Sequence, residues 1–398
     1  IKSNKNNQNE VSLPPFASFS NMKSQKISLT PSTLFNRHLM AVGTTNSGKS
    51  TSSLSILDKL IKQRKKTLII DPTGEYIEAF SDVNSLTLGE DTVISTGELS
   101  SQQWEILFET NDNTQGSILS EAMKSLRFQK QTQTSSVYKK IGKSPAEVDA
   151  DMTTVIERGF DLSLLPSQIN QESVEISNRA PNVGKYVYNT FGANVNAWLV
   201  QKVQHKLSNS SFTTFFGDDP SKSNLISKLN EFSHSETSSL YIDCSKIGTT
   251  DGIGGMIVDL ISNHLINLDK IDIKPFVMFI DEVHRYTKSV TNELDYHTGL
   301  TSIAREGRKK GVFLFLTTQN PNDVPDILLG QIGTLLIHRL THSEELRAIQ
   351  NHLKNHTLGQ IKKLNQGESI LTSINLLQDI HITIDECDRK HDNDTPSL

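Results

Sequence analysis

The sequence predicts an α/β fold with a mainly parallel sheet and helices on both faces. Apolar, strand-like runs alternate with segments of helical period near the start of the chain and again from residue 238 onward. In addition, residues 276–280 form an unbroken apolar run of the kind that is buried on both faces of a parallel sheet. Parallel strands need crossover connections, so alternating strands and helices indicate such a sheet.

The first part of this core is predicted at residues 27–100. The expected elements are a strand at 37–42, a helix at 49–63, and strands at 67–70 and 92–95. The first three form a βαβ unit. Residues 1–26 are polar and contain Pro14 and Pro15. They are predicted to be a linker or the tail of an upstream domain.

The middle of the chain, residues 101–237, is rich in Ser, Asn, Gln and Lys and is predicted to be a mostly helical insertion. The second part of the core is predicted at residues 238–387. Its expected elements are a strand at 240–243, a helix at 255–268, a strand at 276–280, a helix at 294–310, strands at 312–317 and 334–339, a helix at 343–353, and two short strands within 367–384. The charged tail, residues 388–398, is predicted to be disordered.

Composition limits the classes of function. A chain of 398 residues with 35% apolar and 21% charged residues can bury a large core. No apolar run approaches the roughly 18 residues that a membrane span needs, so no membrane insertion is expected. The net charge of -5 excludes a wholly basic surface, so DNA binding would need a local patch or a channel built from several subunits. The two cysteines fit a cytoplasmic protein.

Residues 43–50, Gly-Thr-Thr-Asn-Ser-Gly-Lys-Ser, follow an apolar strand and open a helix, which is the context of a phosphate-binding P-loop. Two glycines permit the tight turn, Lys49 can reach the terminal phosphates, and the Ser50 hydroxyl can bind Mg²⁺. The alternative is an ordinary Gly-rich turn. The predicted nucleotide contacts are Gly43, Thr44, Thr45, Asn46, Ser47, Gly48, Lys49, Ser50 and Thr51.

A second motif predicts hydrolysis rather than nucleotide storage. The apolar strand 276–280 ends in Asp281 and Glu282. A parallel sheet would place Asp281 beside the P-loop, where it can support Mg²⁺, while Glu282 polarises the attacking water. Taken alone, this pattern also fits a strand that simply reaches solvent.

Two further residues follow strands that should end at the same edge of the sheet. Gln319 comes after the strand that begins at residue 312 and is predicted to sense the terminal phosphate; the alternative is a turn-forming role before Asn320 and Pro321. Asp71 ends the strand at 67–70 and is a candidate nucleotide contact, with a turn-initiating role as an equal alternative.

Basic residues occur in two places. Arg305 and Arg308 lie on the helix before the Gln319 strand, and one of them is predicted to supply a cation to the reacting phosphate, in its own subunit or in a neighbour. The second group lies in the insertion, where a DNA channel or, as the favoured interpretation, a solvated helix face would explain the charges. Its members are Lys124, Arg127, Lys130, Lys139, Lys140 and Lys143.

The motifs together resemble the HerA branch of the HerA–FtsK ATPases. The resemblance covers roughly residues 27–100 and 238–384. The segments that carry it are the P-loop, Asp-Pro-Thr-Gly-Glu-Tyr at 71–76, Phe-Ile-Asp-Glu-Val-His at 279–284, Ala-Arg-Glu-Gly-Arg-Lys-Lys-Gly at 304–311 and Thr-Gln-Asn-Pro at 318–321. It implies a RecA-like P-loop NTPase core that binds ATP and Mg²⁺. In this family pattern, Lys49 and Ser50 bind the nucleotide and the metal, and Asp281 supports the metal. Glu282 is the base, Gln319 is the sensor, and Arg305 or Arg308 is the arginine that senses or completes a site.

The family resemblance leads to one main hypothesis. It implies that copies of the chain form a hexameric ring around double-stranded DNA. Such a ring would be a translocase or helicase that powers or regulates an effector, such as a nuclease or a sirtuin-like NAD hydrolase. Relatives of this family act either at DNA breaks or in anti-phage defence, and the sequence leaves both settings open. The polar, Asn- and Ser-rich composition and the divergent insertion favour anti-phage defence slightly. Two alternatives stay open: a nucleotide-dependent scaffold for an effector enzyme, and a conjugative or DNA-packaging motor. The family's N-terminal β-barrel does not appear after Ile1, and a preceding domain is expected.

Overall fold

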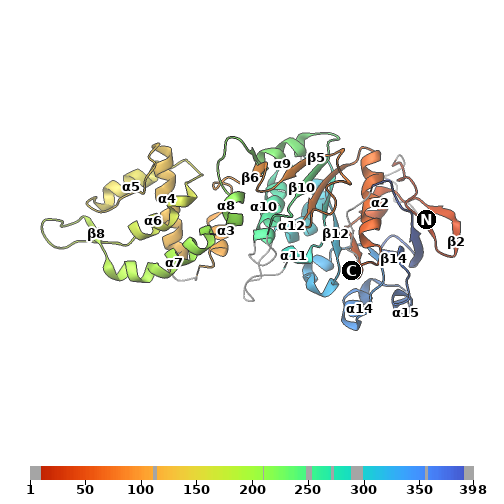
Figure 1. Cartoon of the computed structure of the whole chain (residues 1–398). Helices are drawn as coiled ribbons and strands as arrows, with labels where there is room; N and C mark the ends of the chain where they lie inside the picture. Colours follow the sequence, from red (N-terminus) through yellow and green to blue (C-terminus); the bar gives the residue numbers. More distant parts are fainter. Residues whose placement is uncertain are drawn as a thin grey trace, which may run out of the picture. The chain divides into compact units, whose positions relative to one another are not determined.

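A computed structural model of the chain describes residues 10–110, 114–208, 210–247, 253–269, 273–287, 299–354 and 357–389. The chain divides into two compact units. One consists of residues 1–87 and 229–398 and contains the large sheet; the other consists of residues 88–228 (Figure 1).

The first unit is built on an eleven-stranded sheet among the described residues. The strands from β13 through β5 run parallel, in the order β13 (Thr334–Ile337), β3 (Leu39–Val42), β12 (Val312–Thr318), β11 (Phe276–Ile280), β4 (Lys66–Asp71), β10 (Leu240–Asp243) and β5 (Asn84–Thr87). The predicted α/β fold with a mainly parallel sheet is confirmed. Strand β5 was not predicted, because its Asn-Ser-Leu-Thr sequence has little apolar character.

The register of the central strands brings their carboxyl ends together. Ile280 of β11 is opposite Ile70 of β4 and Leu316 of β12, and Thr318 of β12 is opposite Val42 of β3. The loops that follow these strands therefore emerge at one edge of the sheet, which is where parallel sheets bind ligands.

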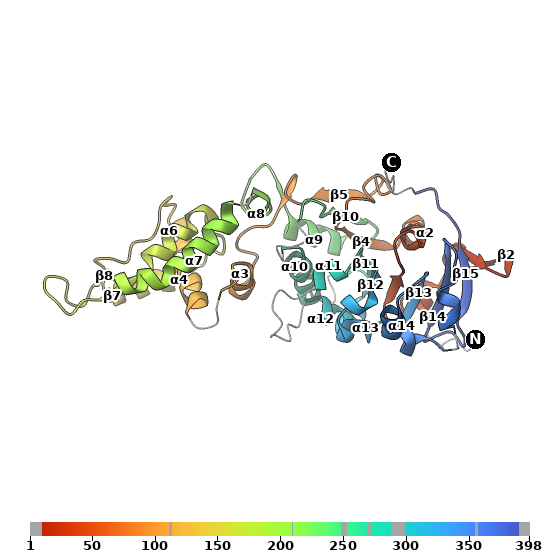
Figure 2. The ribbon, with the colours of Figure 1, turned by 60° about the horizontal axis from the view of Figure 1, so that its bottom comes forward.

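Helices cover both faces of the parallel strands (Figures 1 and 2). On one face, α2 (Lys49–Lys62) buries Leu54 and Leu57 in a core cluster with Ile69 and Phe279. On the other face lie α10 (Ile253–Asn267) and α12 (Gly299–Glu306). Residues 294–298 of the helix predicted at 294–310 lie outside the described residues, and residues 307–310 form a 3₁₀ turn. The remaining helices of this unit are α1 (Pro31–Leu34), α11 (His284–Thr287), α13 (Asp326–Leu329), α14 (Ser343–Ile349) and α15 (Leu358–Ile361), and α9 (Leu225–His234) crosses the boundary between the units.

The other side of the sheet is antiparallel and corrects the prediction for the N-terminus. Beyond β13 come β14 (Glu368–Ser373), β15 (Ile380–Ile384), β1 (Ala17–Phe19) and β2 (Met22–Ile27). The interpretation of residues 1–26 as a linker is therefore wrong for residues 17–26. Five of the six residues of β2 are exposed, so this edge strand has no apolar pattern that would reveal it.

The start of the C-terminal tail is also anchored. Arg389 pairs with Asp58 at 3.0 Å and donates from Nη2 to Asp82 at 2.8 Å, and its guanidinium lies over the ring of Phe80. The expectation of disorder from residue 388 is wrong at Arg389. Composition alone predicts that a charged side chain in this tail is solvated, but the Arg389 guanidinium binds two carboxylates of the folded core. Residues 390–398 lie outside the described residues.

The second unit is mostly helical, as the sequence predicts for the insertion. Its helices are α3 (Ser101–Leu107), α4 (Gln115–Gln131), α5 (Pro145–Thr153), α6 (Leu165–Gln171), α7 (Thr190–Ser208) and α8 (Ser210–Phe215). Two small sheets join β6 (Thr92–Val93) to β9 (Ser223–Asn224) and β7 (Val174–Ile176) to β8 (Tyr186–Tyr188). The strand predicted at 92–95 therefore exists only as β6 and belongs to this unit rather than to the large sheet.

A buried histidine joins three elements at the amino end of β3. His38 donates from Nε2 to the carbonyl of Ala304 at 2.9 Å, and its Nδ1 accepts from the backbone N–H of Leu314 at 2.9 Å. One nitrogen donates and the other accepts, so the ring must be neutral. Burial lowers the pKa of His38 from 6.5 to about 4, although the hydrogen bond to Ala304 acts to raise it.

This arrangement predicts acid sensitivity. The unfolded chain binds a proton on His38 near pH 6.5 but the folded chain only near pH 4, so the unfolding free energy falls as pH drops between these values. We expect this histidine to account for about 2 to 3 kcal/mol of the loss. His38→Gln is expected to be less stable than the parent near neutral pH, and this difference should shrink near pH 4.5.

Urea denaturation of the parent and of His38→Gln across this pH range measures the effect. His205→Gln, which changes an exposed histidine, is the control. A gap between parent and His38→Gln that stays constant with pH would contradict the prediction.

Candidate active site

The P-loop between β3 and α2 adopts a tight turn that requires glycine. Gly48 has φ of +101° and Asn46 has φ of 60°, both in the left-handed region. A Cβ on Gly43 would lie 2.5 Å from Ser47 Oγ and 2.6 Å from the Cβ of His338. Ser47 itself turns inward and donates from Oγ to the carbonyl of Thr44 at 2.6 Å. Gly43 and Ser47 therefore shape the loop.

Neighbouring strands hold the loop from outside. The N–H of Thr44 donates to the carbonyl of Arg339 at 3.1 Å, and the N–H of Gly367 donates to the carbonyl of Ser47 at 3.1 Å. His338 lies beneath, with Nε2 2.9 Å from Ser52 Oγ and Nδ1 3.0 Å from the carbonyl oxygen of Glu368. Burial lowers the pKa of His338 to about 4, which keeps this brace neutral.

A pocket opens at the carboxyl edge of the sheet and unites most of the predicted site. The predicted residues that line it are Thr44, Thr45, Asn46, Gly48, Lys49, Ser50, Thr51, Asp281, Glu282 and Gln319. Four other residues line it as well: Thr73, Glu75, Arg285 and Gln366. The predicted residues Gly43, Ser47, Asp71, Arg305 and Arg308 are not among the described residues that line it.

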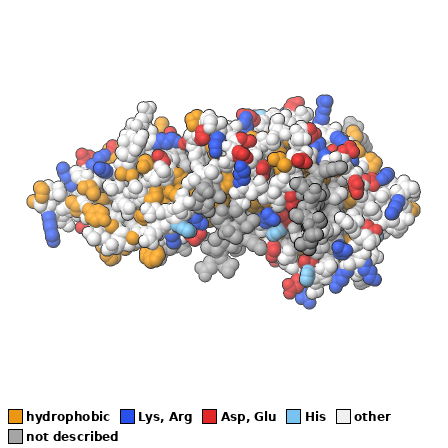
Figure 3. All heavy atoms as spheres, in the orientation of Figure 1, with side chains coloured by type: hydrophobic (Ala, Val, Ile, Leu, Met, Phe, Trp, Pro, Cys, Tyr) orange, Lys and Arg blue, Asp and Glu red, His pale blue; other side chains and the backbone are white. Residues whose placement is uncertain are grey.

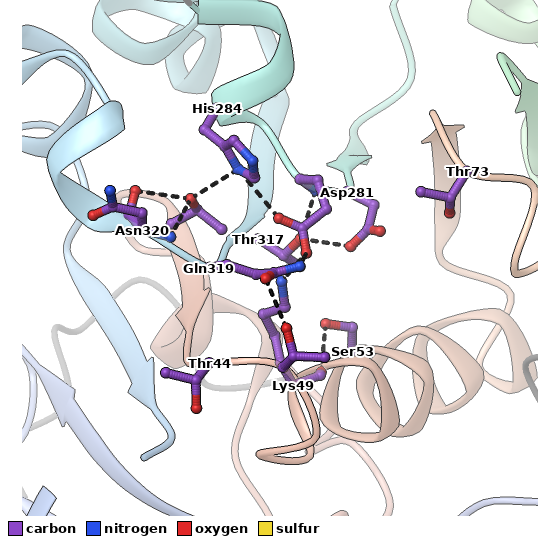
Figure 4. A network of polar contacts seen from close by, with 12 residues as sticks. Thr44, Lys49, Ser53, Thr73, Asp281, His284, Thr317, Gln319 and Asn320 are labelled. Atoms are coloured by element: carbon purple, nitrogen blue, oxygen red, sulfur yellow. Dashed lines mark hydrogen bonds and ion pairs between the residues drawn. The ribbon is translucent and has the colours of Figure 1, made fainter. Parts of the chain in front are cut away.

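Lys49, Glu282 and Gln319 meet in one buried network. The Lys49 ammonium forms an ion pair with Oε1 of Glu282, and their side chains are 6% and 7% exposed. Gln319 donates to the same oxygen at 2.9 Å and accepts from Thr45 Oγ1 at 2.9 Å. His284 Nδ1 lies 3.2 Å from Oε2. Figure 4 shows Lys49, Gln319 and His284 converging from different elements. Residues far apart in the sequence thus form one site.

The backbone at Glu282 is strained and supported. Glu282 has φ of 45°, a left-handed conformation that costs a non-glycine residue about 1–3 kcal/mol. Its N–H donates to Thr317 Oγ1 at 2.8 Å, and that hydroxyl donates to Asp281 Oδ1 at 2.5 Å. Thr317 therefore holds both carboxylate residues at the end of β11, and the turn directs Glu282 into the pocket.

The pKa values of the two adjacent carboxylates, Asp281 and Glu282, are shifted in opposite directions. Burial raises the pKa of Asp281 to about 7, against the charge of Lys49. Burial also acts to raise the pKa of Glu282, but His284, Lys49 and Gln319 outweigh it and lower this pKa to about 2. Glu282 is therefore ionised, and it is a weak base as long as its ion pair with Lys49 persists. A terminal phosphate that drew Lys49 away would raise the pKa of Glu282, because a nearby positive charge that lowers this pKa would be lost.

Ser50 and Asp281 fit the requirements of Mg²⁺. Both line the pocket and offer hard oxygen ligands, and Mg²⁺ in such sites takes one or two protein groups beside the phosphates. The buried Tyr76 hydroxyl lies between them: it donates to Asp281 Oδ1 at 3.4 Å and shares a hydrogen bond with Ser50. Ser50 and Asp281 would hold Mg²⁺, and the ion would neutralise negative charge that develops on the phosphates.

Asp71 acts on the loop rather than on the pocket. Its carboxylate is fully buried and accepts the N–H groups of Thr73 at 2.9 Å, Gly74 at 3.0 Å and Tyr76 at 3.0 Å, and the hydroxyl of Tyr241 at 2.8 Å. The turn interpretation therefore describes Asp71 better than nucleotide contact does. By folding this loop, Asp71 places Thr73 and Glu75 at the pocket.

The two candidate arginines lie elsewhere on this chain. Arg305 is on α12, and Arg308 in the 3₁₀ turn donates to the carbonyl of Asn36 at 2.8 Å. The arginine that lines the pocket is Arg285, which sequence reasoning missed although it lies three residues after Glu282. Gln366 was also missed, and it carries no motif.

Comparisons with known proteins decide the family. The model "Helicase HerA, central domain" matches residues 17–265, more than half of the chain, and the model "Helicase HerA-like C-terminal" matches residues 257–375. The chain belongs to the HerA helicase family. The predicted resemblance is confirmed, and the chain is an ATP-hydrolysing enzyme of this family.

Two HerA relatives show how far the likeness extends. The DNA double-strand break repair helicase HerA of Sulfurisphaera tokodaii is 23% identical over 388 residues, which cover 91% of this chain and 67% of the relative. A probable DNA double-strand break repair helicase HerA of Methanocaldococcus jannaschii is 28% identical over 122 residues, 30% of this chain and 24% of the relative. The chain thus spans about two thirds of the first relative and about a quarter of the second.

Solved structures support the fold of this HerA family member. VirB4 of Thermoanaerobacter pseudethanolicus has a TM-score of 0.63 at 12% identity and covers 96% of this chain and 98% of its own. Plasmid coupling protein TrwB in complex with ADP and Mg²⁺ has a TM-score of 0.59 at 13% identity, with 96% of each chain covered. The expected RecA-like P-loop core is therefore confirmed. Within the described residues, we find no helix with the length and apolarity of a membrane span.

The network predicts separate effects for its two charged members. Glu282→Gln is expected to lower ATP turnover by about a hundredfold or more, because the base is lost, while ATP still binds since Lys49 is released from its ion pair. Lys49→Ala is expected to weaken ATP binding itself. Steady-state ATPase rates and titration with a fluorescent ATP analogue measure the two effects.

Glu344→Gln, which changes an exposed carboxylate on α14, is the matched control and should behave like the parent. Turnover that survives in Glu282→Gln would show that another group activates the water.

Proposed function

We propose that this chain is a ring-forming, ATP-dependent translocase or helicase on double-stranded DNA that works in the cytoplasm. The observation that carries the proposal is the pocket in which Lys49, Glu282 and Gln319 meet, in a chain of the HerA helicase family. A carboxylate base beside the P-loop lysine suits repeated hydrolysis, which a motor needs. The relative from Sulfurisphaera tokodaii, by its name a DNA repair helicase, supports DNA as the substrate.

The position of the candidate arginines supports an oligomer. Arg305 and Arg308 are not among the described residues that line this chain's pocket, although phosphoryl transfer gains from a cation at the reacting phosphate. In a ring, which we expect to be a hexamer, one of them would complete the site of the neighbouring chain.

The proposed DNA path does not depend on the basic residues of the insertion. Lys130 pairs with Asp218, Lys140 with Glu172 and Lys143 with Asp151, so all three already have acidic partners within the insertion. The interpretation as a solvated helix face is wrong for Lys140 and Lys143, because both lie in the loop between α4 and α5 and Lys140 is buried. Of the six basic residues from Lys124 to Lys143, Lys124, Lys130 and Lys139 are exposed. Basic and acidic side chains are also interspersed on the face drawn in Figure 3. We therefore favour a channel formed by several copies of the chain.

The effector remains part of the proposal. We expect the ring to power or regulate a partner such as a nuclease or a sirtuin-like NAD hydrolase, with anti-phage defence as the setting. A scaffold that uses hydrolysis only for switching is the alternative outcome. The likeness to plasmid coupling protein TrwB and VirB4 reflects a shared fold and does not by itself favour a conjugative motor.

DNA dependence of the ATPase separates these functions. Linear duplex DNA is expected to raise the ATPase rate several-fold, because a motor couples turnover to its track. The measurement compares rates with and without duplex, with Glu282→Gln as the inactive control. A rate that ignores DNA, in a preparation that still assembles with an effector, would favour the scaffold.

A mixing experiment tests the arginine. Arg305→Ala or Arg308→Ala alone, and Glu282→Gln alone, are expected to lose most turnover. In mixed rings, about one site in four combines an intact Glu282 with an intact neighbouring arginine, so about a quarter of the parent rate should return. The mixture of Lys49→Ala with Glu282→Gln is the control, since both defects lie in one chain's pocket and no site is repaired. No recovery in the arginine mixtures would rule out action between chains.

A further inference from the structure

Arg285 is the one arginine among the described residues that line the nucleotide pocket. The charged residues of the lining are Lys49 and Arg285 against Glu75, Asp281 and Glu282. The ammonium of Lys49 is already held by Glu282. A triphosphate would add further negative charge to a pocket whose acidic groups outnumber its basic ones. A second cation in the same chain therefore has a clear electrostatic use.

The short helix that carries Arg285 is anchored on both sides. Tyr286 is buried against α10, where a Cβ on Gly254 would lie 3.0 Å from the tyrosine ring and one on Gly255 would lie 3.0 Å from its carbonyl oxygen. Thr287 donates from Oγ1 to the carbonyl of Asp323 at 3.2 Å. The backbone N–H of Arg285 donates to the carbonyl of Glu282 at 2.9 Å. The backbone of Arg285 is thus fixed next to the predicted base.

The neighbours of Arg285 on this helix have other partners. His284 Nδ1 lies 3.2 Å from both Glu282 Oε2 and Thr318 Oγ1, and Tyr286 and Thr287 pack as described above. Arg285 by contrast is exposed and lines the pocket. Its long side chain can therefore extend toward a ligand without breaking a packed contact with the part of the chain that the structure describes.

Glu75 lies close enough to Arg285 to respond to its charge. Burial raises the pKa of Glu75, as do the charges of Asp71 and Glu282, while Lys49 and Arg285 act to lower it. The carboxylate of Glu75 and the guanidinium of Arg285 thus line the same pocket with opposite charges.

We propose that Arg285 binds the terminal phosphate of ATP within its own chain. The planar guanidinium offers paired donors that match two phosphate oxygens, whereas Lys49 supplies a point charge. Arg285 then makes the pocket prefer a triphosphate over a diphosphate, and it complements any arginine that a neighbouring chain supplies. This inference depends on ATP binding in this pocket and not on DNA translocation.

Binding measurements without DNA test the proposal. Affinities for ATPγS and for ADP, both with Mg²⁺, are measured by displacement of a fluorescent nucleotide. Arg285→Ala is expected to weaken ATPγS binding about tenfold while ADP binding changes less than about twofold. Arg285→Lys should give an intermediate loss, because it keeps the charge but not the paired donors. Arg347→Ala, which changes an exposed arginine on α14, should leave both affinities unchanged.

Two results would overturn the proposal. An unchanged ratio of ATPγS to ADP affinity in Arg285→Ala shows that the guanidinium does not contact the terminal phosphate. Equal weakening of both nucleotides, with or without a lower melting temperature, assigns Arg285 a structural role. The binding assay contains no DNA, so its outcome does not depend on whether DNA stimulates the ATPase. The proposal for Arg285 and the proposed function can therefore be contradicted independently of each other.

Discussion

The buried ion pair between Lys49 and Glu282 is the interaction on which the site depends. Taking both charges out of water is costly, and such a pair persists only where further hydrogen bonds complete it. Gln319 supplies such a bond to Oε1 of Glu282, and Nδ1 of His284 lies 3.2 Å from Oε2. The pair therefore fixes the P-loop, the end of β11 and the residues after β12 relative to one another. A phosphate that binds Lys49 would have to compete with Glu282 for its charge.

Parallel register makes this pair possible. The alignment of β4, β11, β12 and β3 brings the residues after each strand to one edge, and Thr317 ties Glu282 to Asp281 across two strands. The antiparallel strands contribute at a distance: the N–H of Gly367, beside β14, reaches the carbonyl of Ser47 in the P-loop. The two short strands predicted within residues 367–384 thus border a residue that holds the phosphate-binding turn.

The sequence predicts those parts of the molecule whose cause is local. The P-loop needs glycine at fixed places, and β11 is a continuous apolar run, so the residue pattern alone predicts that Lys49, Asp281 and Glu282 come together, and all three line one pocket. Other features depend on partners far along the chain. Arg285 lines the pocket because Tyr286 and Thr287 fix its helix there. Arg389 is ordered because it pairs with the carboxylates of Asp58 and Asp82. The edge strand β2 is polar and lacks any periodic signal.

Contacts also lead from the base to the loop after Gln319. His284 joins Glu282 to Thr318, and Thr318 Oγ1 donates to the carbonyl of Asn320 at 3.0 Å. The side chain of Asn320 accepts the N–H of Asn322 and caps the 3₁₀ turn that ends at Asp323, whose carbonyl accepts from Thr287. Hydrolysis changes the charge next to Glu282, where this series of contacts begins. A loop connected to Glu282 through a series of polar contacts is suited to report such a change of charge to whatever the ATPase moves.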